Sequence, residues 1–312
     1  MFVHHFKEDN MKYKDWLHLW LNDYVKTSCK HRTYALYEDT IEQRILPYLS
    51  EFELQELTPQ ILQKFVTELL TTRSRPLSTS TVNQVITVVQ SSLKMAYNMG
   101  YLEEYRADKI CRPKLYEKKV DCLTVLEQKK LETYILHKNK YKLYGIVICM
   151  YTGLRLGELL ALTWDNVDMK ECKISITCTC YYLNNKRIVD TPKTQTSVRT
   201  IPFPRQILPL FKTLKKHSGG SALVIQSKGK PISNRSYQRS FELVLNHINV
   251  ARKGFHSLRH TFATRALECG MDVKTLSELL GHKNPTVTLN RYAHSMLEYK
   301  IQMMNKLGKL FA

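Results

Sequence analysis

Residues 58–70 read TPQILQKFVTELL, and this stretch decides the fold of the first third of the chain. Thr58 can cap a helix, and Pro59 stands at the first helical position, where its missing amide hydrogen has no intrahelical partner to lose. Large apolar side chains follow at helical spacing and form one stripe: Ile61, Leu62, Phe65, Val66, Leu69 and Leu70. We therefore predict an amphipathic helix that buries this stripe against neighbouring helices.

Three further stretches with helical periodicity surround it. They read YKDWLHLWLNDYV at 13–25, TYALYEDTIEQRILPYL at 33–49 and TSTVNQVITVVQSSLKMAYNMG at 79–100, where Gly100 is a helix stop. Four helices of this length predict a small four-helix bundle over residues 11–105.

Two basic segments accompany the bundle. Arg73 and Arg75 stand among hydroxyl side chains just before the last helix, and helix N-termini, hydroxyls and guanidinium groups are what phosphate binding uses. Residues 106–121 are rich in Lys and Arg, include Lys118 and Lys119, and show no sustained periodicity, which predicts a basic linker between two domains. All four side chains are candidate DNA contacts, and an ordinary solvated loop is the alternative for the two arginines.

The second domain, predicted over residues 122–312, mixes helices and strands. Helices come first, up to TGLRLGELLAL, and a strand-rich region follows with CKISITCTCYYL, RIVDT and VRTIPFP, joined by short turns. Helices return from about Ser233 to the C-terminus. The predicted fold class is mainly α: a four-helix bundle followed by a mixed helical domain with one small antiparallel sheet.

Composition limits what the protein can bind. The 312 residues include 47 Lys+Arg and 28 Asp+Glu, a formal net charge of +19 at pH 7. Nucleic acid is the commonest polyanionic partner of such a chain, although any basic, highly soluble protein can have this charge. No stretch approaches the roughly 18 apolar residues of a membrane span, and the N-terminus lacks a signal-peptide core, so we expect a cytoplasmic protein that makes no membrane contact.

The eight cysteines do not have the spacing of a metal site. Cys172, Cys178 and Cys180 cluster in the strand-rich region, but no second Cys/His pair stands at zinc-finger spacing. We predict reduced thiols and neither a metal nor another cofactor.

Two segments place an arginine next to another ionisable group. In TGLRLGELLAL, Arg155 and Glu158 are spaced i, i+3, and Arg155 follows a Thr-Gly break from which a guanidinium can point toward a ligand; a local ion pair is the alternative. In FHSLRHTFATRALECG, His256 and Arg259 project about 60° apart from a helix and present an imidazole beside a guanidinium. An ordinary solvated face is the alternative for this pair.

A third segment, residues 279–295, reads LLGHKNPTVTLNRYAHS. His282 directly follows a helix stop at Gly281, and Tyr292 lies ten residues further on. Taken alone, this segment favours Tyr292 as a core aromatic of a short helix. The other two segments weigh against that interpretation.

Two arginines, two histidines and a tyrosine are together what cleavage of a phosphodiester needs. Arginine forks neutralise the charge that builds on the phosphate oxygens when a tyrosine attacks, and an imidazole can donate a further hydrogen bond. Tyrosine has a pKa near 10, so it needs a neighbouring base or a cationic field to lose its proton. The departing sugar oxygen needs an acid, and Lys193 in the turn TPKTQTS is a flexible amine that can supply the proton.

These segments resemble the signature motifs of the tyrosine recombinases, the phage-integrase-type site-specific recombinases. TGLRLGELLAL, TPKT, FHSLRHTFAT and LLGHKNPTVTLNRYAH match the family's motifs in order and at ordinary spacing, and the resemblance runs over nearly the whole chain. It is closest to integrases of conjugative transposons and of temperate phages of low-GC Gram-positive bacteria. Residues 11–105 then correspond to the family's core-binding, DNA-binding domain, and residues 122–312 to its catalytic domain with a C-terminal tail helix.

The resemblance implies a role for each residue of the site. The six catalytic positions are Arg155, Lys193, His256, Arg259, His282 and the nucleophile Tyr292. Glu158 falls where the family has an acidic residue that supports the site. Many members carry an arm-binding domain before the core-binding domain, whereas only about ten residues precede the first predicted helix. The sequence leaves open whether that domain is naturally missing or truncated.

The implied function is site-specific recombination, in which DNA is cleaved and rejoined through a covalent 3′-phosphotyrosine without a metal or ATP. The expected partners are double-stranded DNA with specific core sites and further copies of the chain, as a homotetramer on two duplexes. The sequence leaves open the target site, the direction of the reaction and any accessory DNA-bending or directionality factors. A type IB topoisomerase uses similar residues and is the alternative enzyme. A non-catalytic DNA-binding regulator is the other alternative, and the complete set of catalytic residues argues against it.

Overall fold

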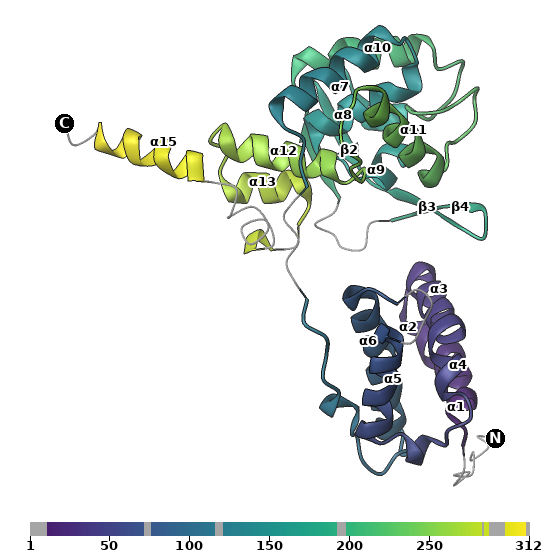
Figure 1. The fold of residues 1–312 in the computed structure, drawn as a ribbon. Coiled ribbons are helices and arrows are strands. Elements are labelled where there is room, and N and C mark those ends of the chain that lie inside the picture. Colours follow the sequence, from purple (N-terminus) through teal and green to yellow (C-terminus); the bar gives the residue numbers. More distant parts are fainter. Residues whose placement is uncertain are drawn as a thin grey trace. The chain divides into compact units, whose positions relative to one another are not determined.

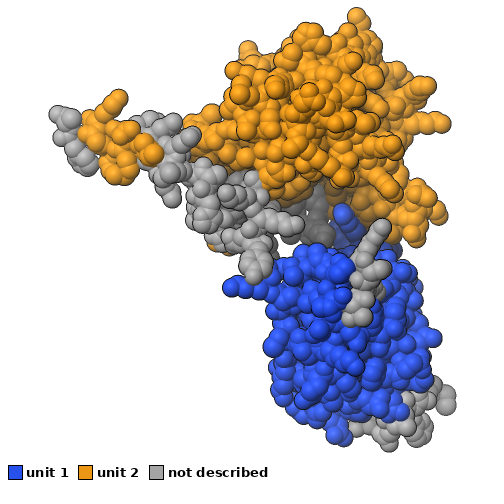
Figure 2. All heavy atoms as spheres, in the orientation of Figure 1, with its two compact units in different colours: residues 1–118 blue, residues 119–312 orange. Residues whose placement is uncertain are grey.

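The computed structural model describes residues 11–71, 76–115, 121–191, 198–282, 284–286 and 297–309. The chain forms two compact units, residues 1–118 (unit 1) and 119–312 (unit 2), which Figure 2 shows in different colours. Among the described residues, no helix is long and apolar enough to cross a membrane.

Unit 1 is a bundle of four helical stretches in its described residues (Figure 1). The first consists of α1 (Tyr13–Leu19), a π-helical segment (Trp20–Val25) and α2 (Lys26–Ser28); the second of α3 (His31–Thr40), a π-helical segment (Ile41–Ile45) and α4 (Leu46–Leu49); the third is α5 (Pro59–Thr71) and the fourth α6 (Thr79–Asn98). Short 3₁₀ turns lie at Leu54–Glu56 and Ala107–Lys109. The predicted four-helix bundle is confirmed.

The apolar stripe predicted for α5 lies in the core of the bundle. Leu62, Phe65, Val66 and Leu69 are buried, and Ile61 and Leu70 are partly buried. Trp16 of α1 is fully buried, and its indole Nε1 donates to the carbonyl oxygen of Ser92 in α6 at 3.1 Å. The tryptophan thus ties the first helix to the last while its own polar atom stays satisfied.

The chain after α6 remains attached to the bundle. Ile110 is buried in the core, and the guanidinium of Arg112 donates to Oε1 of Gln90 in α6 at 2.6 Å. The first half of the stretch predicted as a linker, residues 106–121, is therefore fastened to α6. Because side-chain hydrogen bonds make much of this attachment, it leaves no hydrophobic periodicity in the sequence. The predicted domain boundaries at 105 and 122 stay a prediction.

Unit 2 is mainly helical. Its helices are α7 (Val125–His137), α8 (Tyr144–Thr152), α9 (Leu156–Ala161), α10 (Leu208–Lys216), α11 (Asn234–His247), α12 (Ser257–Glu268), α13 (Val273–Leu280) and α15 (Leu297–Gly308), and its strands are β1 (Val167–Asp168), β2 (Lys173–Ile176), β3 (Thr179–Leu183), β4 (Lys186–Asp190) and β5 (Arg199–Pro202). Short 3₁₀ turns lie at Tyr141–Leu143, Trp164–Asn166 and Arg205–Ile207. The predicted fold class, mainly α with small antiparallel pairing, is confirmed.

The described strands form two antiparallel sheets, where the sequence predicted one. β2 lies between β1 and β5, with Ile174 opposite Ile201, while β3 pairs with β4 in a separate hairpin. Residues 172–183, predicted as a single strand, therefore break after Ile176. The expectation of one sheet was wrong because alternation continues through the break and does not show that the two halves pair with different partners.

Helix α8 forms the centre of unit 2. Ile146, Val147, Ile148 and Cys149 are all fully buried, so the helix is apolar on every side, as a helix enclosed by others must be. α12 packs directly against it (Figure 1). This packing fixes the C-terminus of α8, where the candidate site begins.

Candidate active site

The turn between α8 and α9 places Arg155. Gly153 ends α8 in the left-handed conformation, with φ 66°, and a Cβ there would lie 2.5 Å from Cδ1 of Phe262. Arg155 follows as the N-cap of α9, and its backbone amide donates to Oε2 of Glu158 at 2.9 Å. Its side chain is 36% exposed, so the guanidinium can meet a ligand. The predicted break before Arg155 is confirmed.

Glu158 is buried and holds two arginines. Its Oε1 accepts from Nη1 of Arg155 at 2.8 Å and from Nη1 of Arg199 at 3.1 Å, and its Oε2 accepts from Nη2 of Arg199 at 2.9 Å. Burial raises the pKa of Glu158, but the hydrogen bonds and charge of Arg199, with the charge of Arg155, outweigh it and lower the pKa to about 2. The local ion pair considered as an alternative is present, but it is part of a larger group.

Arg259 on α12 is only 2% exposed. Its Nη1 donates to the carbonyl oxygen of Gly153 at 3.0 Å and its Nη2 to that of Leu280 at 2.5 Å. These carbonyls lie at the C-terminal ends of α8 and α13, where the peptide dipoles favour a cation and offset its desolvation. The expectation that Arg259 shares an exposed face with His256 was wrong, because helical spacing does not reveal backbone carbonyls from other helices.

His256 does have the exposed position that was expected. It is the N-cap of α12, and its ring stands nearly perpendicular to that of His260, with centroids 4.6 Å apart and an interplanar angle of 88°. The imidazole therefore lies one turn before Arg259 on the same helix.

Three arginines donate hydrogen bonds to the C-terminus of α13. Gly281 adopts the left-handed conformation, with φ 64°, and the backbone amides of Gly281 and His282 bond back to the last turn of the helix at 3.0 Å each. Three consecutive carbonyls accept from three guanidinium groups: Leu279 from Nε of Arg199 at 2.6 Å, Leu280 from Nη2 of Arg259 at 2.5 Å, and Gly281 from Nη2 of Arg155 at 3.4 Å. The partly buried His282 follows immediately.

The structure thus brings Arg155, Glu158, Arg259 and His282 together, and it places His256 on the same helix as Arg259. The other predicted residues lie outside the described ranges, and their roles stay predictions: Arg73, Arg75, Lys118, Lys119, Lys193 and Tyr292.

Arg199 belongs to this site although the sequence interpretation did not single it out. It is the first residue of β5, two positions before the buried Ile201, so both side chains project from the same face of the strand. An arginine on the buried face of a strand is uncommon unless it is paired. That alternation in VRTIPFP was the signal available in the sequence.

All eight cysteines are outside disulfides. Within the ranges that the structure describes, no group of three or more His, Cys, Asp or Glu side chains is placed to hold a metal ion.

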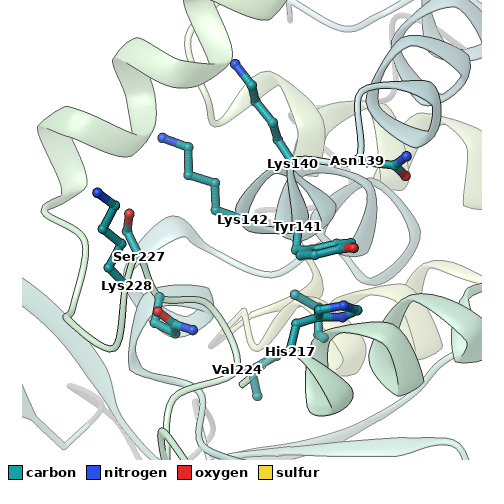
Figure 3. A pocket seen from close by; sticks show the side chains of 10 residues that line it. Asn139, Lys140, Tyr141, Lys142, His217, Val224, Ser227 and Lys228 are labelled. Carbon is teal, nitrogen blue, oxygen red and sulfur yellow. The ribbon is translucent and has the colours of Figure 1, made fainter. Parts of the chain in front are cut away.

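A cavity of about 380 Å³ lies elsewhere in unit 2 (Figure 3). Its lining includes Tyr141 and His217, whose rings stack with centroids 4.0 Å apart, and three lysines, Lys140, Lys142 and Lys228. None of the described candidate residues lines it. The candidate residues therefore lie away from this cavity, at the end of α13.

Two family models match the sequence. Residues 117–298 match the phage integrase family, and residues 12–70 match the phage integrase N-terminal SAM-like domain. The first match alone covers more than half of the chain.

Curated proteins with similar sequences agree with this match. A tyrosine recombinase XerC-like protein of Caldanaerobacter subterraneus is 27% identical, and the match covers 95% of this chain and 83% of that protein. The ICEBs1 integrase of Bacillus subtilis is 25% identical over 86% of this chain and 76% of its own length.

Solved structures show the same fold. The integrase of transposon Tn1549, in complex with transposon right end DNA, superposes with a TM-score of 0.80 at 22% identity and covers 96% of this chain and 100% of its own. A lambda integrase tetramer bound to a Holliday junction gives a TM-score of 0.69 at 17% identity, and the match covers 89% of this chain and 79% of the lambda integrase chain.

Proposed function

The chain belongs to the phage integrase family of tyrosine recombinases, enzymes that cleave and rejoin DNA in site-specific recombination, and from this premise we propose how its residues divide the reaction. The observation that carries the proposal is the convergence of Arg155 and Arg259 on adjacent carbonyls directly before His282. Two guanidinium groups, and the backbone of the histidine that carries the third candidate group, are thereby fixed at a single helix end.

Arg155 and Arg259 form the phosphate-binding part of the site. Charge builds on the non-bridging oxygens of the scissile phosphate as the nucleophile attacks. Guanidinium groups that are already held in place stabilise this charge without reorganising during the step. Arg155 has the more exposed side chain of the two and is held by Glu158. His282 donates a further hydrogen bond to the same phosphate.

Tyr292 supplies the nucleophile. Its phenolate oxygen bonds to phosphorus while the bond from phosphorus to the 5′-oxygen breaks, which gives a 3′-phosphotyrosine and a free 5′-hydroxyl. His256 assists removal of the phenol proton, and Lys193 gives a proton to the departing 5′-oxygen. The 5′-hydroxyl of a partner strand then attacks the phosphotyrosine and releases the tyrosine. One phosphodiester-type bond replaces another at each step, so no ATP is consumed.

The proposed partners are two DNA duplexes with specific core sites, held by four copies of the chain in the cytoplasm of a bacterial cell. The net charge of +19 suits a DNA partner. Lambda integrase, which shares this fold, has been solved as a tetramer bound to a Holliday junction. In α15, the described apolar side chains Ile301, Met304 and Leu307 are 53%, 65% and 42% exposed, so a helix face is available to a neighbouring copy.

The test uses DNA whose scissile phosphate is replaced by a methylphosphonate, which carries no charge. Arg155→Ala should cleave ordinary DNA slower by about 10²–10³-fold, the usual cost of removing one group that stabilises developing charge. Most of this deficit should disappear on the methylphosphonate, because less charge needs to be neutralised. His256→Ala, which removes help at the nucleophile, is the control and should stay impaired on both substrates. An Arg155→Ala variant that is equally slow on both would contradict the assignment.

A further inference from the structure

Arg199 is almost completely buried, and the contacts of its guanidinium group show what it holds. The side chain is 6% exposed. Nη1 and Nη2 donate to the two carboxylate oxygens of Glu158 at 3.1 and 2.9 Å, and Nε donates to the carbonyl of Leu279 at 2.6 Å. A bidentate fork of this kind fixes the orientation of a carboxylate as well as its position.

The contact between Arg199 and Glu158 changes how far Glu158 neutralises the charge of Arg155. If Glu158 had Arg155 as its sole partner, the pair would be neutral and the carboxylate would compete with a phosphate for the same guanidinium. With Arg199 as a second partner, the three groups together carry one net positive charge. The more exposed cation is Arg155, at 36%. The excess charge is therefore available on the side of the group that a ligand can reach.

Arg199 also packs beneath the turn that leads to His282. A Cβ at Gly281 would lie 3.0 Å from Nη1 of Arg199 and 3.1 Å from its Cδ. This approach is closer than most side chains allow, so a side chain at position 281 would press on the guanidinium as well as strain the left-handed backbone. One side chain thus contacts both Glu158, which holds Arg155, and the helix end before His282.

We propose that Arg199 is a positioning residue for strand cleavage, which fixes Glu158 so that Arg155 keeps its direction and its charge for the scissile phosphate. It touches no reacting atom in this scheme. The inference rests on the proposed function of Arg155, and it adds a third arginine that acts through Glu158. Removal of Arg199 should therefore impair the chemical step more than DNA binding.

The experiment compares Arg199→Gln with Arg155→Ala in single-turnover cleavage of ordinary and methylphosphonate DNA. Misplacement of a catalytic group by about 1 Å costs roughly 10²-fold in rate, so Arg199→Gln should be slower by about that factor on ordinary DNA. Its deficit should shrink on the neutral substrate to the same extent as that of Arg155→Ala. DNA affinity, measured separately by titration, should change little.

Arg265→Gln is the matched control. Arg265 also bridges a carboxylate and a carbonyl, those of Glu268 and Leu123, but it does so away from Glu158. Thermal unfolding of the two variants shows how much stability each arginine provides. Arg265→Gln should cleave both substrates at the wild-type rate, even if it unfolds at a temperature as low as that of Arg199→Gln.

Two further variants keep the inference testable if Arg199→Gln does not fold. Glu158→Gln retains the shape of the side chain and removes the charge that Arg199 holds, so it should follow the Arg155→Ala pattern. Arg199→Lys keeps the charge without the fork and should remain impaired. Different substrate responses of Arg155→Ala and these variants would overturn the positioning role. If Arg155→Ala is itself not rescued by the neutral substrate, the proposed phosphate contact fails. The role of Arg199 is then decided by whether its variants still match Arg155→Ala.

Discussion

The Nη2 atoms of Arg155 and Arg259 donate to neighbouring carbonyl oxygens, those of Gly281 and Leu280, at 3.4 and 2.5 Å. The two arginines come from segments far apart in the sequence, and the carbonyls belong to a third segment, the one that continues to His282. Helix C-termini carry partial negative charge, so each cation is stabilised where it stands. The end of α13 therefore fixes the relative positions of two arginines before any DNA is bound.

Glu158 should make stability depend on pH in the acid range. Its pKa is lowered from 4.5 to about 2, so between these values the unfolded chain binds more protons than the folded one. The stabilisation from the ionised carboxylate is complete above about pH 5 and is lost as the pH falls through about 2. From about pH 6 to about pH 3, the unfolding free energy of wild type should fall by about 2 kcal/mol more than that of Glu158→Gln. Urea denaturation at the two pH values measures these free energies. A difference between wild type and Glu158→Gln that is the same at both pH values would contradict the lowered pKa of Glu158.

Lys193 should act as the general acid. General acid catalysis contributes about 10²–10⁴ in rate, so Lys193→Ala should cleave ordinary DNA slower by that order. A substrate with sulfur in place of the 5′-bridging oxygen releases a thiolate, which needs no proton. Lys193→Ala should recover near-normal cleavage on this substrate, and Arg155→Ala should not. If sulfur fails to rescue the lysine variant, the acid has to be sought first at His282.

Lys118 and Lys119 should contribute to DNA affinity without contributing to sequence preference. For each lysine that binds a phosphate, its replacement should flatten the dependence of log K on log salt by about 0.9. The double Ala variant should bind all sequences more weakly and alike, and the same reasoning applies to Arg73 and Arg75. Replacement of Lys129 and Lys130, two exposed lysines on α7, removes the same charge and serves as the control. Weaker binding confined to the cognate site would show instead that the linker lysines read bases or DNA shape.

Helix α15 should serve assembly more than binding. Three of its described apolar side chains, Ile301, Met304 and Leu307, are 53%, 65% and 42% exposed. Deletion of residues 297–312 should leave binding to a single site mostly intact and impair synapsis and strand exchange. Light scattering on paired sites measures the assembly. Normal assembly of the truncated protein would mean that the helix serves only its own unit.

Local patterns were enough to predict most of the helices and the position of Arg155, but not the environment of the arginines. Helix α10 was missed, because it lies before Ser233, where helices were expected to return. The stripe from Ile61 to Leu70 and the break at Gly153 are signals between near neighbours in the sequence, and both elements formed as expected. The burial of Arg259 depends on carbonyls from two other helices, which no periodicity encodes.

The environment of Arg199 could not be predicted from local patterns either. Its position on the inward face of β5 was visible in the alternation of VRTIPFP, but its partner Glu158 lies on α9. The choice between a solvated arginine and a buried one depends on that long-range pairing. Hydrogen bonds likewise attach Arg112 to α6, where composition alone indicated a linker.

The most direct test of the account is the covalent complex that Tyr292 is expected to form. On a nicked suicide substrate, the wild-type protein should give a denaturation-resistant protein–DNA band, and proteolysis with mass spectrometry should locate the DNA on Tyr292. Tyr292→Phe removes a single hydroxyl, so it should bind the same DNA with similar affinity and give no such band. A covalent band from the Phe variant, or DNA attached to another residue, would contradict the assignment of the nucleophile.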